Sequence, residues 1–299
     1  MLKKSKELRE NWPIHLFFVL FSLIFIIPLI YIISASFTNE EALLIEGYKL
    51  IPAQFDLTAY KYVFANTTNL VDAYIVTAFS SITATILSLL IMSAAAYPLS
   101  RNDFAGKEIV TFIIFFTMLF GGGTIPTYIL ITKYLKLGNT IWVYVVTGLC
   151  SAFNIIVIKT FFKGIAEAVI ESAKIDGASE FRIFFQIVLP LSKPVLATIG
   201  LMVLLGKWGD WYTSLLYIRD QRLYTLQYLL QKVLREAEFI KQMAQEMPLG
   251  VEVAVAAEGT PTETMKFALC ILAAGPMLVV FPFFQKYFAK GFIVGSVKG

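Results

Sequence analysis

Six long apolar runs, separated by polar stretches, account for most of this chain of 299 residues. An apolar stretch of about 20 residues can cross the hydrocarbon part of a bilayer as a helix. A bilayer has no water to satisfy an open strand edge, so the runs predict an all-α, polytopic membrane protein with six transmembrane helices. The expected spans cover residues 13–36, 71–99, 109–132, 140–162, 195–218 and 264–288.

The composition excludes several functions. Hydrophobic residues make up 58% of the chain and charged residues 15%, whereas an average soluble domain carries about 25% charged residues. The formal net charge of +4 is small, so we expect membrane lipid rather than nucleic acid as a partner. Cys150 and Cys270 lie inside apolar runs and His15 begins the first run. Neither a disulfide framework nor a metal site is expected.

The ends of the chain set its expected orientation. The first run is too long for a typical signal-peptide core, although Ser34-Ala35-Ser36 could pass for a cleavage site, so we interpret it as an uncleaved span. Lys and Arg cluster at the N-terminus, after the second and fourth runs, and in the tail. By the positive-inside rule, residues 1–12 and 289–299 then face the cytoplasm and flank a six-span transmembrane domain at 13–288.

A polar segment at residues 163–194 lies between the fourth and fifth runs. Two apolar stripes at helical spacing flank Gly177, where a residue without Cβ lets the backbone turn sharply. The pattern predicts two short amphipathic helices joined at a glycine elbow and held against the membrane, with Pro190 and Pro194 ending the second helix and starting the next span. A loop that contacts only lipid headgroups is the alternative. The stripes are Ala168, Ser172 and Ile175, then Phe181, Phe184, Phe185 and Val188.

The same segment carries an irregular motif. Glu171-Ser172-Ala173 is followed after three residues by Gly177, and after nine more by Ile187-x-Leu189-Pro190. This spacing resembles the EAA motif of bacterial ABC importer permeases, with Ser172 in place of the first alanine. The resemblance implies a type I ABC importer permease fold in the bacterial cytoplasmic membrane. It also implies an ATPase-coupling role for Glu171, Ser172, Ala173, Asp176, Gly177, Ile187, Leu189 and Pro190.

The resemblance implies partners as well. A second homologous permease, two cytoplasmic ATPase subunits and an extracellular or periplasmic solute-binding protein are expected. ATP and Mg would bind to the ATPase subunits, so this chain should need no cofactor and should not be an enzyme. Gly200 to Lys207 looks like a phosphate-binding loop, but it has the wrong glycine spacing and lies in an apolar run.

The fifth run contains Lys207 and Asp210. Each charged residue costs about 2.5–3.5 kcal/mol at the bilayer centre, so the two are expected to pair with each other or to face a wet cavity. Trp208, Trp211 and Tyr212 beside them could stack on sugar rings. Sugar permeases, which this region resembles, often carry Trp-Asn-(Asp)-Trp here, whereas this chain has Gly209 in place of Asn. An aromatic belt with a salt bridge to the partner permease is the alternative.

Two further regions are functional candidates. The third run contains Gly121-Gly122-Gly123-Thr124-Ile125-Pro126, which should interrupt a helix. We expect Gly122 and Pro126 either to face the translocation path or partner, or to form a packing kink. Residues 219–263 are expected to hold a helix at about 226–245 and a turn at 259–261. By resemblance to maltose-type permeases this loop contacts the binding protein, and a solvated cap is the alternative.

The C-terminal tail resembles that of sugar permeases, K-G-x-x-x-G-(A/S)-V-K-G. The resemblance implies that the tail reaches between the ATPase subunits through Gly291, Gly295, Lys298 and Gly299.

Together these features predict one permease subunit of an ATP-driven carbohydrate importer, with an oligosaccharide as substrate. An ABC permease for a non-sugar solute would share the coupling motif but not the tail or the aromatic cluster. An ion-driven secondary transporter would need acidic residues spread through the spans, and only Asp210 is clearly buried in one. A sensor or scaffold would leave the coupling motif unexplained.

Overall fold

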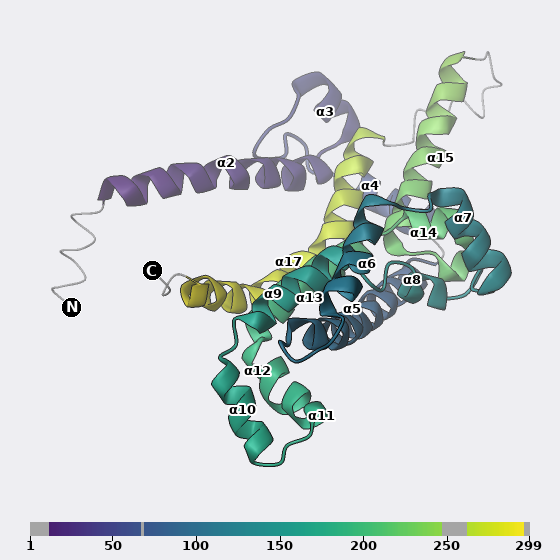
Figure 1. Cartoon of the computed structure of the whole chain (residues 1–299). Coiled ribbons are helices and arrows are strands. Elements are labelled where there is room, and N and C mark those ends of the chain that lie inside the picture. The colour runs from purple at the N-terminus through teal and green to yellow at the C-terminus, as the bar shows by residue number, and fades with distance from the viewer. Residues whose placement is uncertain (1–11, 67–68, 247–261, 296–299) are drawn as a thin grey trace. The chain divides into compact units, whose positions relative to one another are not determined.

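The computed structural model of the chain describes residues 12–66, 69–246 and 262–295 and is helical almost throughout (Figure 1). Within these ranges an isolated bridge between Thr38 and Phe55 is the sole β pairing. The chain divides into two compact units. One comprises Met1–Thr68 and Leu230–Gly275, and the other comprises Asn69–Leu229 and Pro276–Gly299.

The first unit contains the N-terminal span and the polar segment that follows it. Helix α2 (Trp12–Ser36) exposes its apolar side chains until its last three residues, which are buried. Phe37 then stacks on Phe55 and Tyr60, with ring centroids 5.7 and 5.1 Å apart. Helices α3 (Glu40–Glu46) and α4 (Thr58–Asn66) complete this polar segment.

Two later helices begin or end in this first unit. Helix α15 (Leu226–Glu246) matches the helix expected at about 226–245. Helix α17 (Glu263–Gly295) contains the last predicted span. The expected turn at 259–261 lies outside the described residues.

The second unit is built around the long helix α5 (Leu70–Ser100), which packs against α9 (Ala152–Lys163) and α13 (Lys193–Trp208). Small and hydroxylated side chains of α5 are buried, among them Ser81, Ala84 and Ser88. Such residues let membrane helices approach closely. A Cβ on Gly200 of α13 would lie 3.0 Å from Cδ1 of Leu89, so a larger residue here would force the Leu89 side chain to shift.

The third run is broken, as its glycines predict. Helix α6 (Lys107–Leu119) is followed by α7 (Thr124–Ile129) and the π-helical turn η1 (Leu130–Tyr134). The helix direction bends by 109° between α6 and the segment Thr124–Tyr134. Gly123 at the break has φ +82°, a conformation that favours glycine.

The fourth run differs from the prediction of one continuous span. It forms α8 (Trp142–Val146) and α9, with a non-helical stretch between them. Gly148 in that stretch has φ +68°. A left-handed residue interrupts the helical hydrogen-bond ladder, although the run is apolar enough to look continuous.

The fifth run is broken too. Helix α13 ends at Trp208, and α14 (Tyr212–Tyr217) begins after a short turn. Beyond it lies the 3-10 turn η3 (Gln221–Leu223).

By length and composition, three helices of the described chain can cross a membrane: α2, α5 and the Glu263–Gln285 part of α17. Two bent pairs, in the third run and at Glu180–Trp208, raise that number to five. The full count of six spans and the cytoplasmic termini therefore stay predictions.

The polar segment at 163–194 folds into the two expected helices, α10 (Glu167–Ile175) and α11 (Glu180–Ile183), on either side of Gly177. Gly177 has φ +77°, as a glycine elbow requires. Figure 1 shows α10, α11 and α12 projecting from one end of the second unit.

The two prolines flank a bend, close to where they were expected to end one helix and start the next span. The helical path continues from α11 through η2 (Phe184–Val188) and α12 (Leu189–Leu191), and a 79° bend separates it from α13, which begins at Lys193. Pro190 lies one residue before the end of this path, and Pro194 lies in the first turn of α13, where its missing N–H group needs no helical partner.

Candidate functional site: the glycine elbow and a cavity between broken spans

One apolar core joins the helix bundle of the second unit to the elbow. Ile170 and Ala173 of α10, with Ile183, Phe184 and Val188 beyond the elbow, are buried in it. Their partners come from the ends of α5, α9 and α13 and include Met92, Ala96, Tyr97, Ile158, Phe162 and Ile199. Both elbow helices are thus anchored to the spans by packing.

The opposite face of α10 is exposed. Ala168, Ser172 and Ile175, the first predicted stripe, all lie on the surface, and Ile175 is 86% exposed. Ala173 of the motif is buried, whereas Glu171 and Asp176 are exposed near Gly177. An exposed apolar stripe with charges beside it is suited to contact another protein.

The second predicted stripe is split by the structure. Phe184 and Val188 are buried, whereas Phe181 is 78% exposed and Phe185 is also exposed. The buried face includes Ile183, which the stripe did not contain. Further along the motif, Ile187 and Leu189 pack against the core and Pro190 is exposed.

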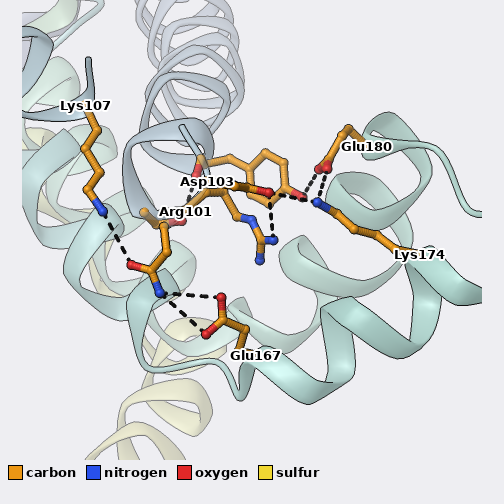
Figure 2. Close-up of polar contacts among 9 residues, drawn as sticks. Arg101, Asp103, Lys107, Glu167, Lys174 and Glu180 are labelled. Atoms are coloured by element: carbon orange, nitrogen blue, oxygen red, sulfur yellow. Dashed lines mark hydrogen bonds and ion pairs between the residues drawn. The ribbon is translucent and has the colours of Figure 1, made fainter. Parts of the chain in front are cut away.

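A group of charged residues, which we call the clasp, fastens the elbow to the loop after α5. The clasp consists of Asp103, Lys174 and Glu180 (Figure 2). The Lys174 ammonium donates to the Asp103 carboxylate at 2.9 Å and lies 2.8 Å from the Glu180 carboxylate. Lys174 therefore bridges the loop and both elbow helices.

Other polar contacts surround the clasp. Arg101 lies 3.4 Å from Asp103, and the Tyr97 hydroxyl donates to Glu180 at 2.5 Å. Asn102 donates to Glu167 at the start of α10, at 3.4 Å, and accepts from Lys107 (Figure 2). Residues 97–107 thus contact α10 at both of its ends as well as α11.

Charge pairing in the clasp shifts the pKa values of its members. The hydrogen bond from Lys174 is the largest influence on Asp103 and, with Arg101, holds the pKa of that carboxyl below its usual value. Hydrogen bonds to Glu180 and Asp103 raise the pKa of Lys174. Asp103 and Lys174 therefore both stay charged across the neutral range.

The sequence did not reveal the clasp. Asp103 and Lys174 are 71 residues apart, and each belongs to a short polar stretch of the kind that is usually solvated. The available signal was that the loop after the second span and the coupling motif were both expected on the same side of the membrane.

The charged residues of the fifth run line a cavity of about 400 Å³ in the second unit. Lys207 and Asp210 come from the end of α13, and Thr147 and Gly148 come from the break in the fourth run. Val203, Gly206 and Thr213 complete the lining. Lys207 and Asp210 thus line a shared cavity, and the expectation that this cavity is wet stays a prediction.

Lys207 and Asp210 each also bind the end of a short helix next to a break. The Lys207 ammonium donates to the carbonyl oxygens of Tyr144, at 2.7 Å, and Thr147 at the end of α8. Asp210 accepts from the Thr213 backbone N–H at 3.0 Å and from its hydroxyl at 2.6 Å, at the start of α14. A cation at a helix C-terminus and an anion at an N-terminus each satisfy backbone groups that the helix leaves unpaired.

The other predicted path residues do not belong to the lining of this cavity. Trp208 is buried, and Trp211 packs edge-on against the exposed Tyr212, with centroids 5.8 Å apart. Gly122 and Pro126 are exposed at the break of the third run. In the tail, Gly291 and Gly295 belong to α17, and Lys298 and Gly299 lie outside the described residues.

A buried polar network, missed by the sequence, supports the broken spans. The Tyr144 hydroxyl bonds to Ser214, at 2.7 Å, and to the Leu223 carbonyl, at 2.7 Å. Thr225 joins Ser214 to the Asp210 carbonyl. No residue type in this set stands out in an apolar run, so only the fold brings it together.

Apolar helices of membrane-crossing length, broken spans beside a cavity and an exposed glycine elbow fit a membrane transport permease. Residues 11–294 match the family model described as "Binding-protein-dependent transport system inner membrane component". The chain belongs to this family and is therefore an inner-membrane component of such a transport system.

Two relatives come from Bacillus subtilis (strain 168). The polygalacturonan/rhamnogalacturonan transport system permease protein YtcP is 39% identical over 95% of this chain and 96% of its own length. Protein LplC is 39% identical over 92% of this chain and 90% of its own length. A crystal structure of a bacterial ABC transporter involved in importing the acidic polysaccharide alginate aligns with a TM-score of 0.73 and 28% identity, covering 94% of this chain and 98% of that one.

Proposed function

We propose that this chain is the permease subunit of an ATP-driven importer that takes up oligosaccharides by alternating access. The family membership supports transport that depends on a binding protein. The named polysaccharides of YtcP and of the alginate transporter support a carbohydrate substrate.

The observation that carries the proposal is the elbow. Its helix α10 exposes Ala168, Ser172 and Ile175 and buries Ile170 and Ala173 in the core shared with the spans. A cytoplasmic ATPase that binds the exposed stripe would act on a helix already packed against α5 and α9. Closure of the ATPase subunits on ATP and Mg would then move the spans, and this chain would hold no nucleotide itself.

The sugar would cross between this permease and a second, homologous one. The cavity beside Lys207 and Asp210 is the candidate stretch of its path in this chain, since 400 Å³ falls in the range of small-molecule sites. Trp208, Trp211, Tyr212, Gly122 and Pro126 stay candidates for contact with the sugar or the partner permease.

The partners would meet this chain on opposite sides of the membrane. The solute-binding protein would contact the segment at residues 219–263 from outside. The tail containing Gly291, Gly295, Lys298 and Gly299 would reach between the ATPase subunits inside.

The test is uptake by the complete transporter in proteoliposomes, using labelled oligogalacturonate, maltotetraose and leucine as probes. Gly177→Pro and Glu171→Lys should abolish sugar uptake while membrane insertion stays normal, because one destroys the elbow and the other reverses a charge beside the docking stripe. Gly177→Asn is the matched control for the elbow, since Asn tolerates the left-handed conformation better than most residues. Sugar uptake that persists with Gly177→Pro and Glu171→Lys would refute the coupling role, and uptake of leucine alone would refute the substrate class.

A further inference from the structure

The clasp connects the loop after α5, helix α10 and helix α11. Apolar packing leaves a gap between the end of α5 and α11. A cavity of about 510 Å³ lies between the end of α5 and α11, and Tyr97, Phe181, Phe184 and Phe185 contribute to its lining. Arg101, Asp103 and Glu180 line the same cavity. Along this side of α11, polar contacts therefore span a gap that side-chain packing does not fill.

The clasp contributes little to holding the elbow in place. The side chains of Lys174, Asp103 and Glu180 are 36%, 57% and 53% exposed, and exposed ion pairs contribute about 0–1 kcal/mol each. Burial of Ile183 and Phe184 is a larger source of attachment. These ion pairs contribute little energy but require a specific geometry, so their suitable role is to set the angle between α10 and α11.

The geometry of the clasp fixes such an angle. Lys174 is the last basic residue of α10, and Glu180 is the first residue of α11, so their contact closes across Gly177. The contact of Lys174 with Asp103 then ties the closed elbow to the loop that leads from α5 to α6.

From these contacts we infer that Lys174 is a positioning residue for energy coupling: through Asp103 and Glu180 it passes movement of α10 to α5 as well as to α11. Because α5 packs against α9 and α13, movement of its end reaches the bundle by a route additional to the shared apolar core and to the chain connections through α9 and α12. This inference rests on the proposed function, since it requires an ATPase that moves α10.

The experiment uses the complete transporter, with its partner permease, ATPases and binding protein, reconstituted in proteoliposomes. The readout is the number of labelled sugar molecules taken up per ATP hydrolysed, measured together with co-purification of the ATPase. For Lys174→Met the ratio should fall by about 2–30-fold, the range expected when a residue between two coupled sites is changed. ATPase binding and ATP hydrolysis should persist.

Three further variants and a control sharpen the test. Asp103→Asn should lower the ratio in the same way, and the double variant should be no worse than either single one, because both remove the same contact. Lys174→Arg should preserve the ratio, since a guanidinium can contact both carboxylates. Lys163→Met removes an exposed positive charge from the end of α9 and should leave the ratio unchanged.

The outcomes separate the two proposals. If the wild-type permease does not bind the ATPase, the proposed function fails and the clasp fails with it. If binding is normal and the ratio is unchanged in Lys174→Met and Asp103→Asn, the proposed function stands and the clasp is refuted. Loss of ATPase binding in Lys174→Met would make this residue a docking contact, which also overturns the inference.

Discussion

The two units each contain a carboxylate that joins distant segments, and the two sites use different physics. In the second unit the clasp joins the elbow to residue 103 by exposed ion pairs. In the first unit the half-buried Glu40 joins α3 to the start of α17, through contacts with Thr262, Glu263 and Thr264. We call Glu40 with residues 262–264 the latch.

The latch is built as a static fastening. Glu40 accepts from the backbone N–H groups of Glu263, at 2.9 Å, and Thr264, at 2.8 Å, and from the Thr264 hydroxyl at 2.7 Å. These N–H groups begin a helix and have no partner within it. A carboxylate at that position satisfies them and complements the positive end of the helix dipole.

The difference between the two sites predicts how firmly each holds its segments together. Hydrogen bonds to a half-buried charge are strong and hold one arrangement, whereas exposed ion pairs are weak and can be remade. The latch suits a part that keeps its shape, and the clasp suits a part that moves. Changes at the apolar core under the clasp, at the latch and in the pH test this difference, in order of decreasing expected effect.

The largest effect is expected from the apolar core under the clasp. Ile183→Ala removes a fully buried side chain of α11 and should destabilise the elbow by about 2–5 kcal/mol, because a cavity replaces packed methyl groups. Limited proteolysis between residues 163 and 194 measures the change. Phe181→Ala, on the exposed face of the same helix, is the control and should behave like wild type. Equal protease resistance of Ile183→Ala and wild type would show that the clasp alone holds the elbow.

The next effect is expected at the latch. Glu40→Ala leaves helix-start N–H groups unpaired and should cost about 1–3 kcal/mol of unfolding free energy. Its melting temperature in detergent should be lower than that of wild type. Glu41→Gln changes the neighbouring exposed carboxylate and should leave the melting temperature unchanged. A Glu40→Ala protein as stable as Glu41→Gln would mean that the latch is not a fastening.

The smallest effect is a pH dependence confined to acid. Burial tends to raise the pKa of Glu40, but the hydrogen bonds from Glu263, Thr264 and Thr262 outweigh it and hold the pKa below the usual 4.5. A lowered pKa gives stability that is complete above the unfolded-state pKa and is lost as the pH falls through the folded-state pKa.

The stability difference between wild type and Glu40→Gln should therefore stay constant from pH 8 to about pH 5 and decrease only below the usual carboxyl pKa. Melting curves of both proteins between pH 3.5 and pH 8 measure it. A difference that disappears near pH 6 would contradict the assignment of these hydrogen bonds. The ion pairs of the clasp should also persist from pH 8 to about pH 5, because the pKa of Asp103 is lowered and that of Lys174 is raised.

Local sequence signals predicted the parts of the fold that depend on neighbouring residues. The apolar runs, the Gly121–Gly123 break, the glycine elbow and helix α15 follow from periodicity and glycine content. The break near Gly148 was not predicted, because one left-handed residue in an apolar run barely alters its hydropathy. The bend at Ser192 lies between Pro190 and Pro194, which predicted the end of one helix and the start of the next.

The shape of the elbow was predicted because its residues are contiguous, whereas contacts between residues far apart in the chain were missed. The coupling motif lies within one segment, so its spacing could be read directly. Glu40 and Thr264 are 224 residues apart, and their contact exists only after folding. For Lys207 and Asp210, the sequence indicated unusual charges but could not show that broken helix ends use them.

The elbow imposes a constraint on length as well as on residue type. The four residues between Ile175 and Glu180 form a turn rather than a helix, and Lys174 contacts Glu180 across it at 2.8 Å. Inserting or deleting one residue in this turn would change the distance between the two helix ends, so the contact of Lys174 with Glu180 and the burial of Phe184 could not both be kept. Single-residue insertions here should be tolerated far less well than substitutions, and the number of residues between the two helices is itself a functional property of the chain.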